Sequence, residues 1–263
     1  MENPNSFTFK DWQVYLSENV QSYADRQLLE VYVEKLFSNQ TVVILNFHHL
    51  AHLLGINSRT LSIVLRNIDN YYHKFEIKKR KGGKRVIVSP SPILIEVQNW
   101  ILKEILEKID LHEACIGYVK GKNVIDNAKP HLQSKYIAKI DIEEFFPSIR
   151  INRIISIFKH LGYTNKISYY LAKLCSYENR LPQGACTSPT ISNIVAKRLD
   201  ARLAGLADAF NLNYSRYADD LTFSGDMLPY KIVDYINDIL LSEKFKINHS
   251  KTKLLGKYSQ KIR

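Results

Sequence analysis

Apolar residues recur at helical spacing in the N-terminal part of the chain: Trp12, Leu16, Val20 and Tyr23. The pattern predicts a helix over residues 10–37. Residues 46–67 predict two short helices on either side of Gly55, with Ser58 as the N-cap of the second. This arrangement is superficially that of a DNA-binding helix-turn-helix. We interpret it as a packing unit or as part of an RNA-facing surface.

Farther along, short runs of strand-forming residues alternate with longer segments of helical periodicity. Strands are expected at residues 75–78, 85–88, 136–142 and 245–248, and a β-hairpin at 214–224. Helices are expected at residues 93–109, 151–175 and 230–243, and from Ser188, an N-cap followed by Pro189 at the first helical position.

These elements predict an α+β fold. The chain of 263 residues contains no internal repeat and no low-complexity linker, which favours one compact catalytic module over separate domains. We divide the sequence into an N-terminal helical segment, residues 1–70, and a catalytic region, residues 71–263.

Two adjacent carboxylates, Asp219 and Asp220, lie at or near the tip of the predicted hairpin. Like charges at close range repel, so such a pair is costly unless a cation compensates for it. Mg²⁺ prefers hard oxygen ligands and commonly takes one or two carboxylates together with substrate phosphates. The alternative for an isolated pair is a solvated Asp-Asp turn.

The composition is that of a globular protein, with 45% hydrophobic and 24% charged residues. No apolar run approaches the roughly 20 residues of a membrane span, and the N-terminus lacks the pattern of a secretory signal. Three widely spaced cysteines (Cys115, Cys175 and Cys186) form neither a metal-ligand pattern nor a disulfide framework. We expect a reducing bacterial cytoplasm and no membrane partner.

The net charge of +11 points to a polyanionic partner, most often a nucleic acid. The charge is uneven, because residues 1–40 hold six acids against three bases, whereas residues 244–263 hold seven bases and no acid. Six further bases surround Gly82 and Gly83 within residues 78–85. Each cluster alone could be a solvated face, but together they favour contacts with a phosphate backbone.

A third acid, Asp141, ends the predicted strand 136–142. Between it and the aspartate pair, Gln183-Gly184 forms a turn before a helix, whose N-terminal N–H groups suit a nucleotide. Three carboxylates flanked by basic residues are the components of two-metal phosphoryl transfer, in which cations about 3.5–4 Å apart stabilise the attacking and leaving oxygens.

Four segments resemble the palm motifs of reverse transcriptases, in the family's order. They are Lys139–Ser148, Leu181–Pro189, Tyr217-Ala218-Asp219-Asp220 and Ile247–Thr252. The resemblance implies a right-hand fold with fingers and palm subdomains, a helical N-terminal extension and RNA-directed DNA polymerase activity.

Within that family the chain is most similar to bacterial retron enzymes. Asn127-Ala128-Lys129-Pro130-His131 matches the Asn-Ala-x-x-His segment typical of them. The resemblance implies copying of a structured noncoding RNA into single-stranded DNA (msDNA) from an RNA 2′-hydroxyl primer. It further implies a role in antiphage defence beside an effector protein.

The resemblance assigns roles by position. Asp141, Asp219 and Asp220 would be the catalytic metal ligands, with the backbone of Ile142 nearby, for two Mg²⁺ ions that Mn²⁺ could replace. The residues expected at the dNTP are Lys84, Arg85, Phe146, Gln183, Gly184 and Lys251; Phe146 would be the steric gate against a 2′-hydroxyl and Lys251 would lie on the pyrophosphate side. The residues expected at RNA are Lys78, Lys79, Arg80, Lys81 and His131. Without the resemblance, Phe146 could be core and Lys251 a solvated lysine.

The family continues past this region with a helical thumb, and we expect that the thumb is missing from this chain, through truncation or because another chain supplies it. Three alternatives are weighed against a retron enzyme. They are a group II intron or abortive-infection reverse transcriptase, a non-catalytic RNA-binding scaffold of polymerase shape, and a helix-turn-helix regulator. The last leaves all three aspartates unexplained.

Overall fold

A computed structural model describes residues 7–78 and 82–256. By contacts the chain divides into two compact units. The first unit comprises Met1–Ile109 and Arg150–Ser188, and the second comprises Asp110–Ile149 and Pro189–Arg263. The expected boundary at residue 70 does not separate these units, and the division into 1–70 and 71–263 stays a prediction about the sequence.

The first unit begins with two helices, α1 (Phe9–Asn19) and α2 (Tyr23–Ser38). The prediction of one helix over residues 10–37 is therefore wrong. Val20 adopts an extended backbone (φ −118°, ψ 105°), and the hydroxyl of Ser22 accepts the N–H of Asp25 to cap a new helix. Apolar periodicity continues across this break, so it could not reveal the separate N-cap.

The next two helices are α3 (Phe47–Leu53) and α4 (Ser58–Arg66), as the sequence predicts. Gly55 turns the chain between them at φ +69°. The N-cap of α4 is Asn57, whose side chain accepts the N–H of Thr60, and not Ser58, which is already helical. Both residue types cap well, so the sequence alone did not separate them.

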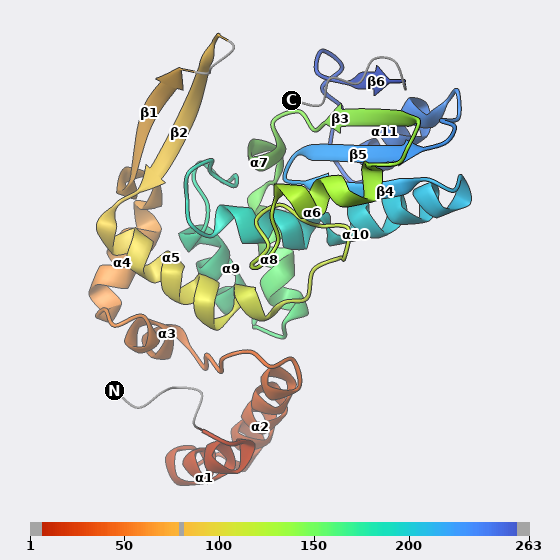
Figure 1. The fold of residues 1–263 in the computed structure, drawn as a ribbon. Coiled ribbons are helices and arrows are strands. Elements are labelled where there is room, and N and C mark those ends of the chain that lie inside the picture. Colours follow the sequence, from red (N-terminus) through yellow and green to blue (C-terminus); the bar gives the residue numbers. More distant parts are fainter. Residues whose placement is uncertain (1–6, 79–81, 257–263) are drawn as a thin grey trace. The chain divides into compact units, whose positions relative to one another are not determined.

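A β-hairpin follows, formed by β1 (Tyr72–Lys78) and β2 (Lys84–Pro90), with a 3-10 turn η1 (Ile68–Tyr71) before it (Figure 1). Helix α5 (Pro92–Glu104) begins with proline, but the predicted helix to residue 109 ends early and gives way to the 3-10 turn η2 (Leu106–Lys108).

The predicted helix 151–175 is also two helices, α8 (Ile151–His160) and α9 (Asn165–Leu174). Gly162, at φ +105°, ends the first, and Thr164 caps the second. In the core of the first unit, the buried Gln98 amide donates to the Tyr72 hydroxyl at 2.8 Å and to the Leu174 carbonyl at 2.9 Å. These bonds join the hairpin, α5 and α9.

In the described part of the second unit, four antiparallel strands form a sheet in the order β4-β5-β3-β6. Their bounds are β3 Tyr136–Asp141, β4 Asn213–Tyr217, β5 Asp220–Gly225 and β6 Lys253–Leu255. The predicted strand 245–248 is wrong: Ile247 makes a single bridge to Ile142, and the pairing strand forms later, as β6.

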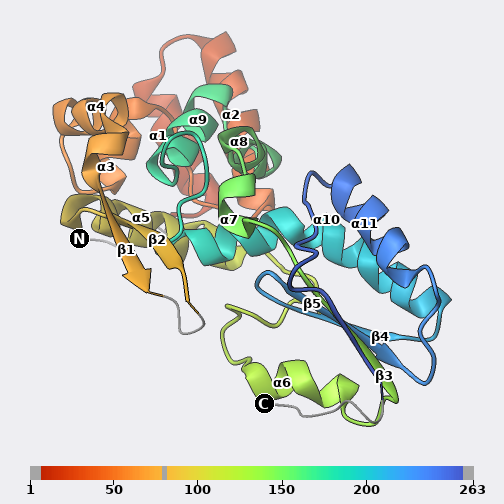
Figure 2. The ribbon, with the colours of Figure 1, turned by 90° about the horizontal axis from the view of Figure 1, so that it is seen from above.

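Helices cover both faces of this sheet. Figure 2 shows α10 (Ser188–Ala209) and α11 (Ile232–Ser242) on one side and α6 (Val124–Ala128) on the other. The 3-10 turn η3 (Lys129–His131) continues α6, and the short helix α7 (Phe145–Ser148) follows β3. Leu221 and Phe223 on β5 are fully buried, so the sheet is a rigid base for residues at the strand ends.

Among the residues described, no helix is both long and apolar enough to cross a membrane.

Candidate active site

The aspartate pair lies on a two-residue hairpin turn, as predicted. Tyr217 and Asp220 form the last strand pair, so Ala218 and Asp219 make the turn. Ala218 adopts φ +58°, which is uncommon for a residue with a side chain. Gly117 lies against it, where an added Cβ would be only 2.5 Å from the Ala218 nitrogen. Gly117 thus allows two backbones to meet behind the turn.

Strand pairing brings the third acid beside the first two. Asp141 on β3 is the register partner of Asp220 on β5. The N–H of Ile142 donates to the carbonyl of Asp219 at 2.9 Å, which joins the end of β3 to the turn. Residues nearly 80 positions apart in the sequence are therefore neighbours at one end of the two central strands.

The three carboxylates influence one another. Partial burial removes water from the Asp220 carboxylate and raises its pKa above the ordinary 3.8. The negative charges of Asp219 and Asp141 raise that pKa further. Asp141 is buried, and its two oxygens accept from the ammonium of Lys251 at 2.7 and 2.9 Å. The hydrogen bonds with Asp141 raise the pKa of Lys251.

These donors fit a hard divalent cation in chemistry, because carboxylate oxygens are the ligands that Mg²⁺ prefers. Across residues 7–78 and 82–256, no three His, Cys, Asp or Glu side chains are gathered as a ready metal cluster. The ammonium of Lys251 already compensates the Asp141 carboxylate. A metal ion bound by Asp141 would have to share this carboxylate with Lys251 or displace the Lys251 ammonium from it.

A buried arginine donates a hydrogen bond to the backbone of this turn. Arg216 on β4 is fully buried and donates to both oxygens of Asp200 on α10 at 2.7 Å. The same guanidinium donates to Asn193 Oδ1 at 3.0 Å and to the Ala218 carbonyl at 3.1 Å. Sequence reasoning missed this role, because an arginine in an apolar strand does not reveal its partner.

Phe146 lies in α7, just after β3, and is half-buried. Its ring centroid is 6.3 Å from that of Tyr118. The neighbouring Phe145 is buried instead, 5.5 Å from the ring of Phe245. The core position is thus filled by Phe145, and the Phe146 ring keeps an accessible surface.

The other residues expected at the dNTP lie in the first unit. Lys84 and Arg85 are exposed on β2, and Lys84 pairs with Glu76 at 2.6 Å. The carbonyl of Gln183 accepts the N–H of Val88 on the same strand at 2.8 Å. Gly184 adopts φ +135°, and an added Cβ there would lie 2.8 Å from the Val88 carbonyl.

The Gln183-Gly184 turn is thus built onto the strand that carries Lys84 and Arg85. Gln183 is half-buried and Gly184 exposed.

Two groups of residues were expected at RNA. Lys78 is exposed at the end of β1, while Lys79, Arg80 and Lys81 lie outside the described residues. His131 is buried, and its two ring nitrogens lie 2.7 Å from Ser224 Oγ and 2.8 Å from Ser215 Oγ. Both polar edges of the ring are used inside the second unit, which argues against a direct RNA contact by His131.

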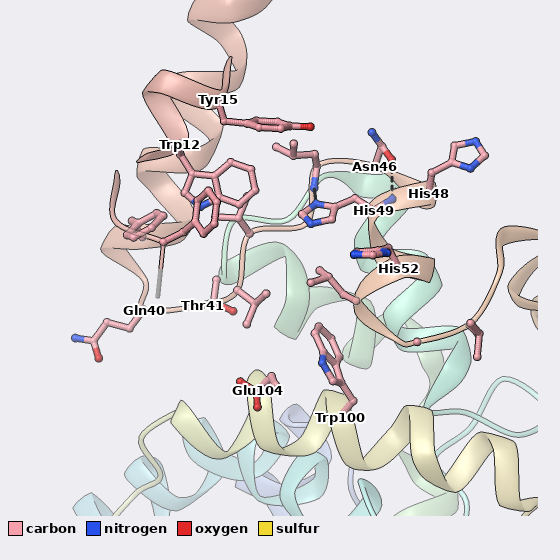
Figure 3. A pocket seen from close by; sticks show the side chains of 18 residues that line it. Trp12, Tyr15, Gln40, Thr41, Asn46, His48, His49, His52, Trp100 and Glu104 are labelled. Carbon is pink, nitrogen blue, oxygen red and sulfur yellow. Dashed lines mark hydrogen bonds between the residues drawn. The ribbon is translucent and has the colours of Figure 1, made fainter. Parts of the chain in front are cut away.

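The first unit also contains a cavity of about 1440 Å³ (Figure 3). Trp12 and Tyr15 from α1, three histidines from α3 and Trp100 from α5 line it. The lining includes neither lysine nor arginine and none of the residues predicted at the site. It therefore lacks the cationic groups that a triphosphate requires.

Comparison with known proteins places these features in a family. The model of the family "Reverse transcriptase (RNA-dependent DNA polymerase)" matches residues 77–261. The retron Ec86 reverse transcriptase of Escherichia coli is 37% identical over 220 residues, which cover 82% of this chain and 69% of the relative. The retron Mx162 enzyme of Myxococcus xanthus is 31% identical over 242 residues, covering 79% of this chain and 50% of the relative.

A third relative, the retron Mx65 reverse transcriptase of Myxococcus xanthus, is 33% identical over 204 residues and 48% of its length. The chain thus spans between about half and about two thirds of these curated relatives.

The match over residues 77–261 places the chain in the reverse transcriptase class of polymerases. The chain belongs to the reverse transcriptase family, and within it to the retron type.

Proposed function

We propose that this chain carries the catalytic centre of a retron RNA-directed DNA polymerase. The observation that supports it most is the pairing of Asp141 with Asp220, held by the bond from Ile142 to Asp219. This places the three acids at adjoining strand ends, where their carboxylates would supply ligands for metal-assisted transfer of a nucleotidyl group. The second unit would be the palm, and the β1–β2 hairpin part of the fingers.

Each acid has a role in this proposal. Asp141, Asp219 and Asp220 would hold two Mg²⁺ ions, or Mn²⁺ in their place. Bound there, the metals would lower the pKa of the primer hydroxyl and neutralise the leaving pyrophosphate. The N–H of Ile142 is already used by Asp219, so its carbonyl is the backbone group left for the metal site.

The remaining residues would bind and select the nucleotide. Lys84 and Arg85, exposed on β2, suit a triphosphate, because exposed cations on a hairpin can close over phosphates. Gln183 and Gly184, built onto the same strand, would contact the nucleotide or template. Phe146 would exclude a 2′-hydroxyl, and Lys251 would move from Asp141 toward the pyrophosphate.

The template, product and biological role that we propose are those that the resemblance to retron enzymes implies. The template would be a structured noncoding RNA, copied into single-stranded msDNA from an RNA 2′-hydroxyl, with Lys78–Lys81 on its phosphates. The enzyme would act in the bacterial cytoplasm in antiphage defence, beside an effector protein. The net charge of +11 supports a nucleic-acid partner.

The test is dNTP incorporation by the full-length gene product on its noncoding RNA, with Mg²⁺. D219N should reduce incorporation by at least about 1000-fold, since the metal site supplies several kcal/mol of transition-state stabilisation. The matched control is D226N, at an exposed aspartate just after β5 that pairs with Lys135. Firm RNA binding with no synthesis by the wild type would instead favour the scaffold alternative.

A further inference from the structure

The buried imidazole of His131 connects both strands of the hairpin that carries Asp219 and Asp220. Its Nδ1 lies 2.7 Å from Ser224 Oγ on β5, and its Nε2 lies 2.8 Å from Ser215 Oγ on β4. All three residues are buried. The ring is therefore a bridge between adjacent strands and has little exposure to a ligand.

The hydrogen bonds around the ring have one consistent direction. Ser134 Oγ donates to Ser224 Oγ at 2.8 Å, and Ser215 Oγ donates to Asn127 Oδ1 at 2.9 Å. The hydroxyl of Ser224 is then free to donate to Nδ1, and the oxygen of Ser215 accepts from Nε2–H. This order assigns the neutral Nε2–H tautomer to His131.

A neutral ring also agrees with its surroundings. Burial lowers the pKa of His131 to about 4, and the nearby charge of Lys139 lowers it further. At neutral pH one nitrogen is a donor and the other an acceptor, as the order of the bonds requires.

The contacts lie on the same face of the hairpin as one of the catalytic acids. Ser215 pairs with Thr222, and side chains at alternate positions share a face, so Ser215, Ser224 and Asp220 lie on one side. Ser224 is four residues from Asp220, about 13 Å along a strand. Rotation of either strand at the serines would therefore change the direction of the acid.

The spacing of the Asn-Ala-x-x-His segment has a physical reason in this arrangement. Residues four apart on a helix are neighbours on its surface, and Asn127 in α6 and His131 at the end of η3 both reach Ser215. Asn127 and His131 therefore contact the hairpin from the same side of this helical segment.

We infer that His131 is a positioning residue, which with Asn127 fixes β4 and β5 relative to each other and so aims Asp219 and Asp220. This inference rests on the proposed function of those acids. The neutral imidazole forms one hydrogen bond with the hydroxyl of Ser224 and one with the hydroxyl of Ser215, and we call this arrangement the clamp.

The test is a series of variants in the full-length gene product, measured by single-nucleotide incorporation and thermal melting. H131F keeps the ring shape and loses both hydrogen bonds. H131Q places an amide near Nε2 and retains a partner for Ser215, while H131N retains one for Ser224. H160F, at an exposed histidine on α8, is the matched control.

We expect kcat to fall about 10- to 100-fold in H131F, because misplacement of a catalytic group by about 1 Å has this effect. The KM for dNTP should change less than about threefold, since the clamp touches no nucleotide. H131Q and H131N should recover part of kcat. An unchanged kcat per folded H131F molecule, or lost RNA binding with normal kcat, would overturn the inference.

A second experiment uses the wild-type protein and does not measure activity, so it tests the inference even if the variants fail to fold. Nitrogen-15 NMR of the histidine rings at pH 7 should show a neutral Nε2–H tautomer for His131, and an Nδ1–H tautomer or an imidazolium would contradict the clamp. If D219N remained active, the proposed function would fail. If D219N is inactive while H131F is normal, only this inference fails.

Discussion

The ammonium of Lys251 lies 2.7 and 2.9 Å from the two carboxylate oxygens of Asp141. Asp141 is nearly buried, while the Lys251 side chain is more than half exposed. An exposed cation thus compensates a buried acid that we propose as a metal ligand. Metal binding and Lys251 then compete for the same carboxylate.

Replacing Lys251 by methionine should therefore strengthen metal binding while it slows synthesis. Without the ammonium the site is more negative, so Mn²⁺ should bind about threefold or more tightly. The kcat should fall if Lys251 acts at the pyrophosphate. Mn²⁺ titration measures the first effect, with K246M, at an exposed lysine of the same segment, as control. Unchanged or weaker Mn²⁺ binding in K251M would contradict the competition.

Replacing Asp220 by asparagine should stabilise the metal-free protein at neutral pH. The folded state holds the Asp220 proton more tightly than the unfolded state, because the pKa is raised from 3.8. The ionised group therefore costs stability as the pH rises through that raised pKa, and the cost is absent below 3.8. Melting temperatures at pH 7 and pH 3.5 test this.

At pH 7 D220N should melt above the wild type, and at pH 3.5 the difference should vanish. Added Mg²⁺ should narrow the gap at pH 7 by stabilising the wild type. A D220N protein that melts lower than the wild type at pH 7 without metal would rule out this electrostatic cost.

Removal of Arg216 should destabilise the second unit strongly. R216M leaves the buried Asp200 carboxylate without its ion pair, which typically costs about 3–5 kcal/mol. R198M is the control, since Arg198 is exposed and its partner Glu243 keeps a second ion pair with Arg202, so a much smaller loss is expected. Chemical denaturation measures both, and equal losses would show that burial at Arg216 is unimportant.

Phe146→Ala should relax selection against ribonucleotides. Opening space beside the nucleotide sugar should reduce the preference for dNTP over rNTP by about tenfold or more. The ratio of kcat/KM values for the two substrates measures this, and Y118F, which keeps the neighbouring ring, is the control. Unchanged selectivity in F146A would assign Phe146 a packing role only.

The sequence predicted the parts of the fold that rest on local signals. The hairpin around Asp219 was visible because strand-forming residues flank two acids, and β3 because an apolar run ends in Asp141. The retron type was visible from motif order and from Asn127–His131. The helices over 10–37 and 151–175 were each predicted too long, since apolar spacing passes through Ser22 and Gly162 without a change.

What the sequence could not predict depends on distant partners. The buried position of His131 between two serines requires knowledge of how η3 packs on the sheet, about 90 residues away in the chain. Arg216 is similar, because Asp200 and the Ala218 carbonyl become its partners only when α10 lies against β4. The site roles assigned to individual residues stay predictions.

In the proposed function, Asp141, Asp219 and Asp220 together bind the catalytic metal. The most direct measurement is Mn²⁺ binding by electron paramagnetic resonance, in the full-length gene product with RNA template, primer and the next dNTP. D141N, D219N and D220N should each weaken Mn²⁺ binding by about tenfold or more, while D226N binds as the wild type does. If all three variants bound Mn²⁺ as tightly as D226N, the metal site would lie elsewhere and the account would be contradicted.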